Sequence, residues 1–396
     1  MLCSVLMLSS SCVEEFIPEN LSFESLLVVE ASVTDEFKNH EIRLSRTFKF
    51  NDDSLFETGA QVSIIDEFQN VNNFIELEPG TYVSANEFAI QPNINYRLSI
   101  MTKDNSSYES LPMTLPNSSG GITDVTYTRS INADNVVGIE ILVDSFDPTG
   151  NSNYYRFEIE ETYRIVPPWY RVLEIIVISD TPPFEVATQP RSQEERECFN
   201  TLYSTGILQT QTNGFSEDRI TKFPLKFIPA DTTIIRDRYS ILVKQFVQSL
   251  EAYTYFNTLN DFSNSESVFS ENQPGFLNGN IFSKTNSDEK VIGFFEIASM
   301  TSKRIFFNYG DVFPDLTRPP FFAECTDFET PFLSDPSDPS TSPLIEKVKN
   351  NEIEYVEDNT DFFGNIIENQ PFVVINRECG DCTVFGSNIK PDFWID

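Results

Sequence analysis

The chain of 396 residues contains one histidine, His40, and this scarcity limits the chemistry open to the protein. A Ser-His-Asp triad would have to be built on His40, and a site with several histidine ligands is impossible. We expect His40 to be a surface residue beside a turn, because it lies at the edge of an alternating strand pattern. Phosphate-binding glycine loops and the G-x-S-x-G motif are also missing. With no readable catalytic motif, we expect no enzyme, no cofactor and no metal site.

Basic residues are few, with 27 Lys and Arg against 61 Asp and Glu, and the net charge is −34. Such a surface repels phosphate backbones and anionic lipid headgroups. We therefore exclude nucleic acid as a partner and expect any membrane contact to be made through a lipid anchor alone.

No apolar run near the start is long enough to cross a membrane, since residues 2–8 (LCSVLML) fall far short of the roughly 20 residues required. This short run, followed by serines and Cys12, is typical of a lipoprotein signal peptide. We expect a signal peptide over residues 1–11, lipidation of Cys12 and a tether over residues 12–25. Two features depart from the usual pattern: no basic residue precedes the run, and Ser9 stands where leucine is common. The alternative for Cys12 is a buried or disulfide-bonded residue.

Four cysteines remain beyond the predicted signal peptide and lipidation site: Cys198, Cys325, Cys379 and Cys382. An even number in an exported protein predicts two disulfides, and the sequence does not choose among the three possible pairings. The C-x-x-C pair at residues 379–382 also suggests two alternatives, a zinc site and a redox site. Zinc is disfavoured because the other two cysteines are far apart, and a redox site because turn residues surround the motif. We favour structural disulfides over zinc, and zinc over redox chemistry.

The abundance of Phe, Tyr, Val, Ile and Thr predicts a mostly β protein. Short alternating segments with turns between them predict an immunoglobulin-like β-sandwich over residues 26–117. The Pro, Ser and Gly cluster near residues 116–121 marks a boundary, followed by a β-rich C-terminal domain over residues 118–396. One amphipathic helix is predicted near residues 249–262, with Ser249 as its N-cap. Trp169 and Tyr170, at an expected hairpin tip, either cap that hairpin or form a ligand platform.

Several segments together resemble the Bacteroidota lipoprotein family called domain of unknown function 4249. They include LLVVEASVTDE, NYYRFEI and SLEAYTYFNTL, and the most specific is the terminal CGDCTVFGSNIKPDFW. The resemblance covers nearly the whole chain from about Leu26 to Trp394. It implies an outer-membrane lipoprotein that works beside a TonB-dependent, SusC-like receptor, and it supplies no catalytic residues. In that family, acids such as Glu14 and Glu15 behind the lipidated cysteine resemble a signal for export to the cell surface.

Three functions remain open at this stage. The first is a binding or accessory partner of a TonB-dependent nutrient transporter, anchored in the outer membrane and facing the cell exterior. The second is a secreted hydrolase that uses paired carboxylates, such as a glycosidase, for which the abundant acids would suffice. The third is a surface adhesin.

Overall fold

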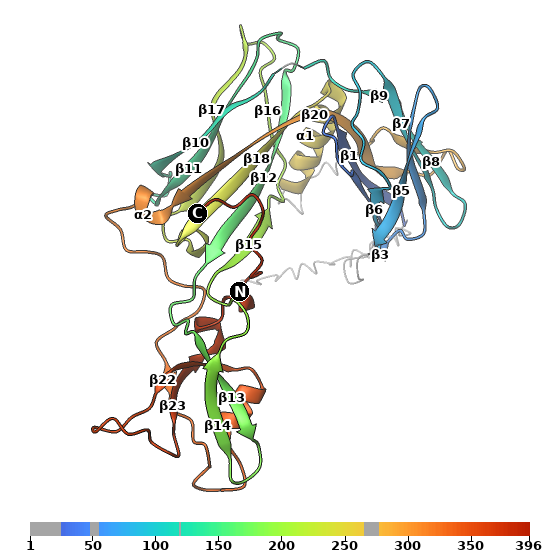
Figure 1. The fold of residues 1–396 in the computed structure, drawn as a ribbon. Coiled ribbons are helices and arrows are strands. Elements are labelled where there is room, and N and C mark those ends of the chain that lie inside the picture. The colour runs from blue at the N-terminus through green and yellow to red at the C-terminus, as the bar shows by residue number, and fades with distance from the viewer. Residues whose placement is uncertain (1–24, 48–54, 119, 265–276) are drawn as a thin grey trace, which may run out of the picture.

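The computed structural model describes residues 25–47, 55–118, 120–264 and 277–396, and the chain is mostly β, as predicted (Figure 1). Its strands form three bodies. The N-terminal body comprises residues 27–114 and 281–298, and the central sandwich comprises residues 121–165, 198–247 and 299–313. The distal lobe comprises residues 173–190 and 328–376.

One continuous sheet forms the N-terminal body, with the strand order β20-β1-β2-β6-β5-β4-β7-β8-β19. Alternate side chains of each strand, such as Val62 and Ile64 of β4, point into a single core. In place of the two facing sheets of the predicted sandwich, one hydrogen-bonded sheet surrounds this core. Its strands include β1 (Leu27–Thr34), β2 (Glu41–Arg46), β3 (Leu55–Phe56), β4 (Gln61–Asp66), β5 (Val71–Glu78), β6 (Thr81–Ser84), β7 (Asn95–Met101), β8 (Ser107–Ser110), β9 (Met113–Thr114) and β19 (Ile281–Ser283).

Strand β20 (Val291–Asn308) joins the N-terminal body to the central sandwich, because its two halves have different partners. Residues 291–298 pair in parallel with β1, whereas residues 299–308 pair antiparallel with β18 (Arg238–Val247). The boundary predicted after residue 117 therefore separates the two bodies only along the first part of the chain. The later strands β19 and β20 complete the N-terminal body, which sequence periodicity does not reveal because it identifies strands but not their partners.

Two facing sheets form the central sandwich and enclose one core. Ile139, Ile141 and Val143 of β11 contribute to this core from one sheet, and Phe157 and Ile159 of β12 contribute from the other. The first sheet has β10 (Gly121–Ile131), β11 (Val137–Asp147) and β17 (Asp218–Pro229). The second has β12 (Tyr154–Ile165), β15 (Cys198–Tyr203), β16 (Leu208–Gln211), β18 and the second half of β20.

The distal lobe combines a hairpin inserted between β12 and β15 with strands from the C-terminal part of the chain, and lies at the lower end of Figure 1. Its small core contains Leu344, Tyr355 and Val374. The elements of the lobe are β13 (Leu173–Ser179), β14 (Glu185–Pro190), β21 (Phe328–Glu329), α3 (Pro343–Lys349), β22 (Ile353–Asp358) and β23 (Phe372–Asn376).

The predicted helix is α1 (Leu250–Asn264), and its N-cap is confirmed because the Ser249 hydroxyl accepts a hydrogen bond from the Ala252 amide at 3.1 Å. Tyr255 on this helix packs against Phe294 of β20. Two short helices that the sequence did not predict are α3 and α2 (Tyr309–Val312).

An ion pair is buried where the N-terminal body meets the sandwich. Arg156 of β12 donates to the carboxylate of Glu296 on β20 at 2.8 Å, and Glu296 is fully buried. The same carboxylate accepts hydrogen bonds from Ser32 of β1 at 2.7 Å and from Gln248 at 2.5 Å. The Arg156 guanidinium lies 4.3 Å from the ring centre of Phe246. These bonds connect strands of both bodies through one carboxylate.

Candidate docking surface

The outer face of the N-terminal body exposes large apolar side chains. Ile75 and Leu77 of β5 are 55% and 68% exposed, and Phe56 of β3 is 56% exposed. Ile75 is directly opposite Val83 of β6 in the sheet register. We call Phe56, Ile75, Leu77 and Val83 the apolar face. Apolar residues gathered on an otherwise acidic surface are typical of contact sites for other proteins.

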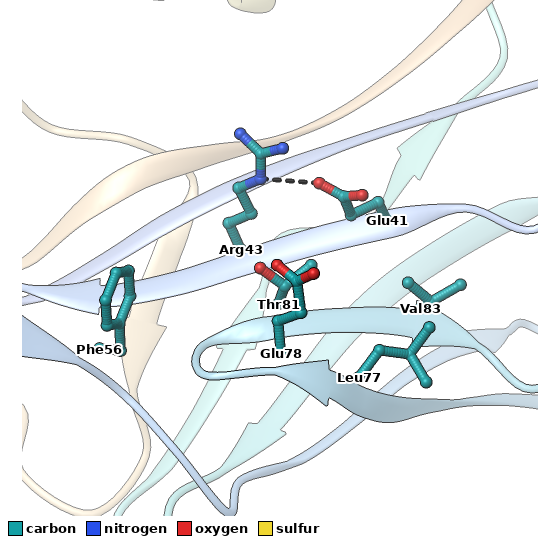
Figure 2. Close-up of a pocket in the computed structure, with 7 residues that line it drawn as sticks. All are labelled: Glu41, Arg43, Phe56, Leu77, Glu78, Thr81 and Val83. Atoms are coloured by element: carbon teal, nitrogen blue, oxygen red, sulfur yellow. Dashed lines mark hydrogen bonds and ion pairs between the residues drawn. The ribbon is translucent and has the colours of Figure 1, made fainter. Parts of the chain in front are cut away.

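The apolar face borders an open groove of about 400 Å³ (Figure 2). Within it, the Arg43 guanidinium donates to the Glu41 carboxylate at 2.7 Å, as the dashed line shows. The residues lining the groove are Glu41, Arg43, Phe56, Leu77, Glu78, Thr81 and Val83. The groove therefore combines apolar contact area with one cation and two carboxylates.

A tight turn between β5 and β6 fixes one edge of the groove, as the Pro79-Gly80 dipeptide predicts. Gly80 adopts φ +73°, and a Cβ at this position would lie 2.5 Å from the Leu44 carbonyl oxygen. The Glu76 carboxylate accepts hydrogen bonds from the amides of Gly80 at 2.9 Å and Gly59 at 2.7 Å. This turn, together with the core residues Phe74 of β5 and Tyr82 of β6, holds Leu77 and its neighbours in place.

The groove lies at the end of the body where the predicted tether joins the sheet. Arg46 of β2 donates to the Ser25 carbonyl at 3.3 Å and forms an ion pair of 2.6 Å with Glu57. Phe56 is opposite Ser45 in the register. Phe56, at one edge of the apolar face, is therefore close to the point at which a lipid anchor on the preceding segment would connect, whereas Val83 is opposite Glu41, further along β2.

The groove is suited to binding rather than to acid–base chemistry. A glycosidase keeps one carboxyl group protonated by placing it in a dry, apolar environment. Glu41 instead has a 45% exposed side chain and is ion-paired with Arg43. Among the described residues, no group of three or more His, Cys, Asp and Glu side chains is arranged to hold a metal ion.

The four cysteine candidates form the two predicted disulfides, which the structure pairs as Cys198–Cys382 and Cys325–Cys379. Each cysteine of the C-x-x-C motif therefore bonds to a distant partner. The first bond connects β15 of the sandwich to the C-terminal segment, and the second closes the base of the distal lobe. Cys12 lies outside the described residues.

Trp169 and Tyr170 are not at a hairpin tip, because β13 pairs with β14 and not with β12. The Trp169 indole N–H donates to the Cys325 carbonyl at 2.9 Å, and its ring packs edge-on against Phe328. Both aromatic side chains are half-buried, and Tyr170 lies beneath the Arg191 guanidinium. Trp169 therefore packs at the base of the lobe and does not form a ligand platform.

The expectation for His40 was wrong, because this residue is 1% exposed. Its Nε2 atom is 3.0 Å from the Phe88 carbonyl oxygen, and its amide donates to the Ser84 hydroxyl. Burial lowers the pKa of His40 below its usual value. The contacts that bury it come from residues more than 40 positions away, which a local pattern does not show.

Sequence reasoning did not find the apolar face, although β5 contains a signal for it. Phe74 and Ile75 are adjacent, so one must point away from the core if the other points into it.

Within the described ranges, no helix is long and apolar enough to cross a membrane.

A family model described as "Domain of unknown function (DUF4249)" matches residues 13–304, more than half of the chain, and it identifies no enzyme family. No curated protein matches the sequence. Among solved structures, the crystal structure of a DUF4785 family protein from Legionella pneumophila has a TM-score of 0.17 and 5% sequence identity, with 55% of this chain and 51% of that chain covered. The chain thus spans about half the length of that protein, and so low a score supports no conclusion about fold or function.

Proposed function

The chain belongs to the family described as domain of unknown function (DUF4249), and we propose that it is an outer-membrane lipoprotein, anchored through Cys12, that binds a TonB-dependent, SusC-like nutrient transporter at the cell surface. The observation that carries this proposal is the apolar face beside the groove at the anchor end of the N-terminal body. The resemblance to Bacteroidota lipoproteins encoded beside such receptors supports the choice of partner.

The length of the predicted tether agrees with a partner in the same membrane. The segment over residues 12–25 could extend at most about 50 Å, since a residue spans no more than about 3.6 Å. The apolar face therefore stays within reach of an integral outer-membrane protein. Restriction to one membrane also raises the effective concentration of the two partners, so an apolar contact of modest size suffices.

The test is a pull-down of the protein tagged at Asp396, extracted from its own outer membrane in mild detergent and followed by mass spectrometry. The proposal predicts a near-stoichiometric TonB-dependent receptor. Recovery of the lipoprotein alone would refute it and would direct attention to glycan hydrolysis and cell attachment, the activities of the hydrolase and adhesin alternatives.

A pair of matched variants locates the contact. Leu77→Asp places a charge within the apolar face, beside Val83 (Figure 2), and should reduce the recovered receptor by about tenfold, the effect of losing one strong contact residue. Leu111→Asp is the control, because Leu111 is 54% exposed in the same body but lies between β8 and β9. Equal recovery with both variants would show that the receptor does not use the apolar face.

A further inference from the structure

The connection between β22 and β23 exposes two adjacent phenylalanines, Phe362 at 97% and Phe363 at 84%. It projects from the distal lobe in Figure 1, far from the N-terminal body. Ile366 and Ile367, on the returning segment of the same connection, are 51% and 37% exposed. We call residues 359–370 the aromatic finger. Single exposed apolar residues are common, but two nearly fully exposed phenylalanines with two isoleucines beside them form a concentrated apolar tip.

Several hydrogen bonds within the finger shape its turn. The Asp361 carboxylate accepts from the amides of Phe363 at 2.8 Å and Asn365 at 2.9 Å, and Gly364 completes the turn with φ +84°. The Asp361 amide donates to the Asn365 carbonyl at 2.8 Å, which closes the tip. These bonds therefore define the backbone of the turn that carries both phenylalanines, so less backbone entropy is lost when they bind.

The base of the finger is tied to the lobe. The Asn359 amide donates to the Pro371 carbonyl at 2.8 Å, and its side chain donates to the Gln370 carbonyl at the same distance. Gln370 in turn donates to the Thr330 carbonyl at 2.6 Å. The apolar tip is thus presented on a support that continues into the sheet of the lobe.

The charges around the tip select the kind of partner. Glu357, Asp358, Asp361 and Glu368 are all exposed, and the sequence contains no Lys or Arg between Lys349 and Arg377. An anionic lipid surface would repel this finger, because insertion of the phenylalanines would bring the Asp361 and Glu368 carboxylates of the finger toward the headgroups, with Glu357 and Asp358 behind them. An apolar pocket rimmed by Lys and Arg side chains would attract it.

From this combination we propose that the aromatic finger is a docking element that inserts Phe362 and Phe363 into an apolar pocket with a basic rim on a second protein. This inference goes beyond the transporter proposal and does not depend on it, because the finger and the apolar face belong to different bodies. It identifies the partner by its chemistry: a protein surface with an apolar cavity and cationic margins.

The first experiment places a photo-crosslinking phenylalanine analogue at position 363 of the full-length protein in its native outer membrane. The control position is Phe215, which is 69% exposed at a tight turn preceding β17. We expect position 363, and not position 215, to crosslink to one protein, at a segment where apolar residues adjoin Lys or Arg. Crosslinks to lipid or to a second copy of this chain would overturn the proposal, as would the absence of any crosslink specific to position 363.

The second experiment measures the affinity of the crosslinked protein, once purified, for finger variants. Replacement of both Phe362 and Phe363 by Ser should weaken binding by at least about tenfold, whereas Phe215→Ser should leave it within about twofold. The double variant Glu357→Lys/Glu368→Lys should weaken binding and reduce its dependence on salt. An affinity that none of these substitutions changes would refute the proposal. An unchanged melting temperature would show that the variants fold.

Discussion

The buried pair of Arg156 and Glu296 gives the sharpest test of how the N-terminal body is joined to the sandwich. The Arg156 side chain is 9% exposed and that of Glu296 is completely buried. Burial opposes the charged form of Arg156, but Glu296 and Glu158 outweigh it and raise the pKa of the guanidinium above its usual value. Arg156 therefore stays charged at every accessible pH, and removal of its partner leaves a buried cation.

Glu296→Gln removes the charge and preserves the size of the side chain. We expect a loss of about 3–5 kcal/mol in the free energy of unfolding, as for other buried pairs broken on one side. Glu158 limits the loss, because its carboxylate also contacts Arg156, although its side chain is 45% exposed. The matched control is Glu217→Gln in the surface pair with Arg219, where we expect no more than about 1 kcal/mol.

The assay is chemical denaturation followed by tryptophan fluorescence. The chain has two tryptophans, and Trp394 packs against Phe199 and Phe306 of the sandwich, whereas Trp169 is in the distal lobe. In a Trp169→Phe background, the fluorescence therefore reports unfolding of the sandwich.

A double-mutant cycle tests the electrostatic explanation. Arg156→Met combined with Glu296→Gln should recover part of the loss, because no unpaired charge then remains. Strictly additive losses would refute the view that the two charges stabilise each other. If Glu296→Gln lowers the free energy of unfolding no more than the surface control does, burial does not make this ion pair more important for stability than a surface pair.

Two further predictions concern covalent links and pH. Replacement of Cys198 and Cys382 by Ser releases a loop of 184 residues and should lower the free energy of unfolding by about 5 kcal/mol. For Cys325 and Cys379, with a separation of 54, the expected loss is about 4 kcal/mol, so the first replacement should lower the melting temperature more. The reverse order would contradict a chain-entropy origin of the stabilisation. Because the pKa of His40 is lowered in the folded state, the unfolded chain binds more protons than the folded protein as the pH falls below about 6.5. The free energy of unfolding of the native protein should therefore fall more steeply in this range than that of the His40→Asn variant. Parallel melting-temperature curves for the two proteins between pH 7.5 and 5.5 would contradict this assignment.

Local features were the part of the fold that could be predicted from the sequence. Period-two alternation located β1 and β4 because one face of each strand is buried. Ser249 marked the start of α1 because its hydroxyl satisfies an amide that the helix leaves unpaired. These features depend on neighbouring residues alone.

Features that depend on distant partners could not be predicted. The apolar composition of β20 does not show that its first half pairs in parallel with β1, more than 250 residues earlier. The pairing of Cys379 with Cys325, rather than with its neighbour in the C-x-x-C motif, is fixed by the packing at the base of the lobe. In the finger, the residues Asp361 and Gly364 indicate a turn, but whether Phe362 points inward or outward depends on what the lobe places beside it.

The position of the disulfides explains how a small lobe can hold a docking finger steady. The lobe core contains only a few buried apolar residues, so packing alone gives it limited rigidity. The Cys325–Cys379 bond and the buried Arg191–Glu354 ion pair fix its base, and the Cys198–Cys382 bond attaches the following segment to β15 of the sandwich. If these links orient the finger, reduction should weaken its binding to a partner under conditions in which the sandwich remains folded. Unchanged binding after reduction would show that the hydrogen bonds of the finger suffice by themselves.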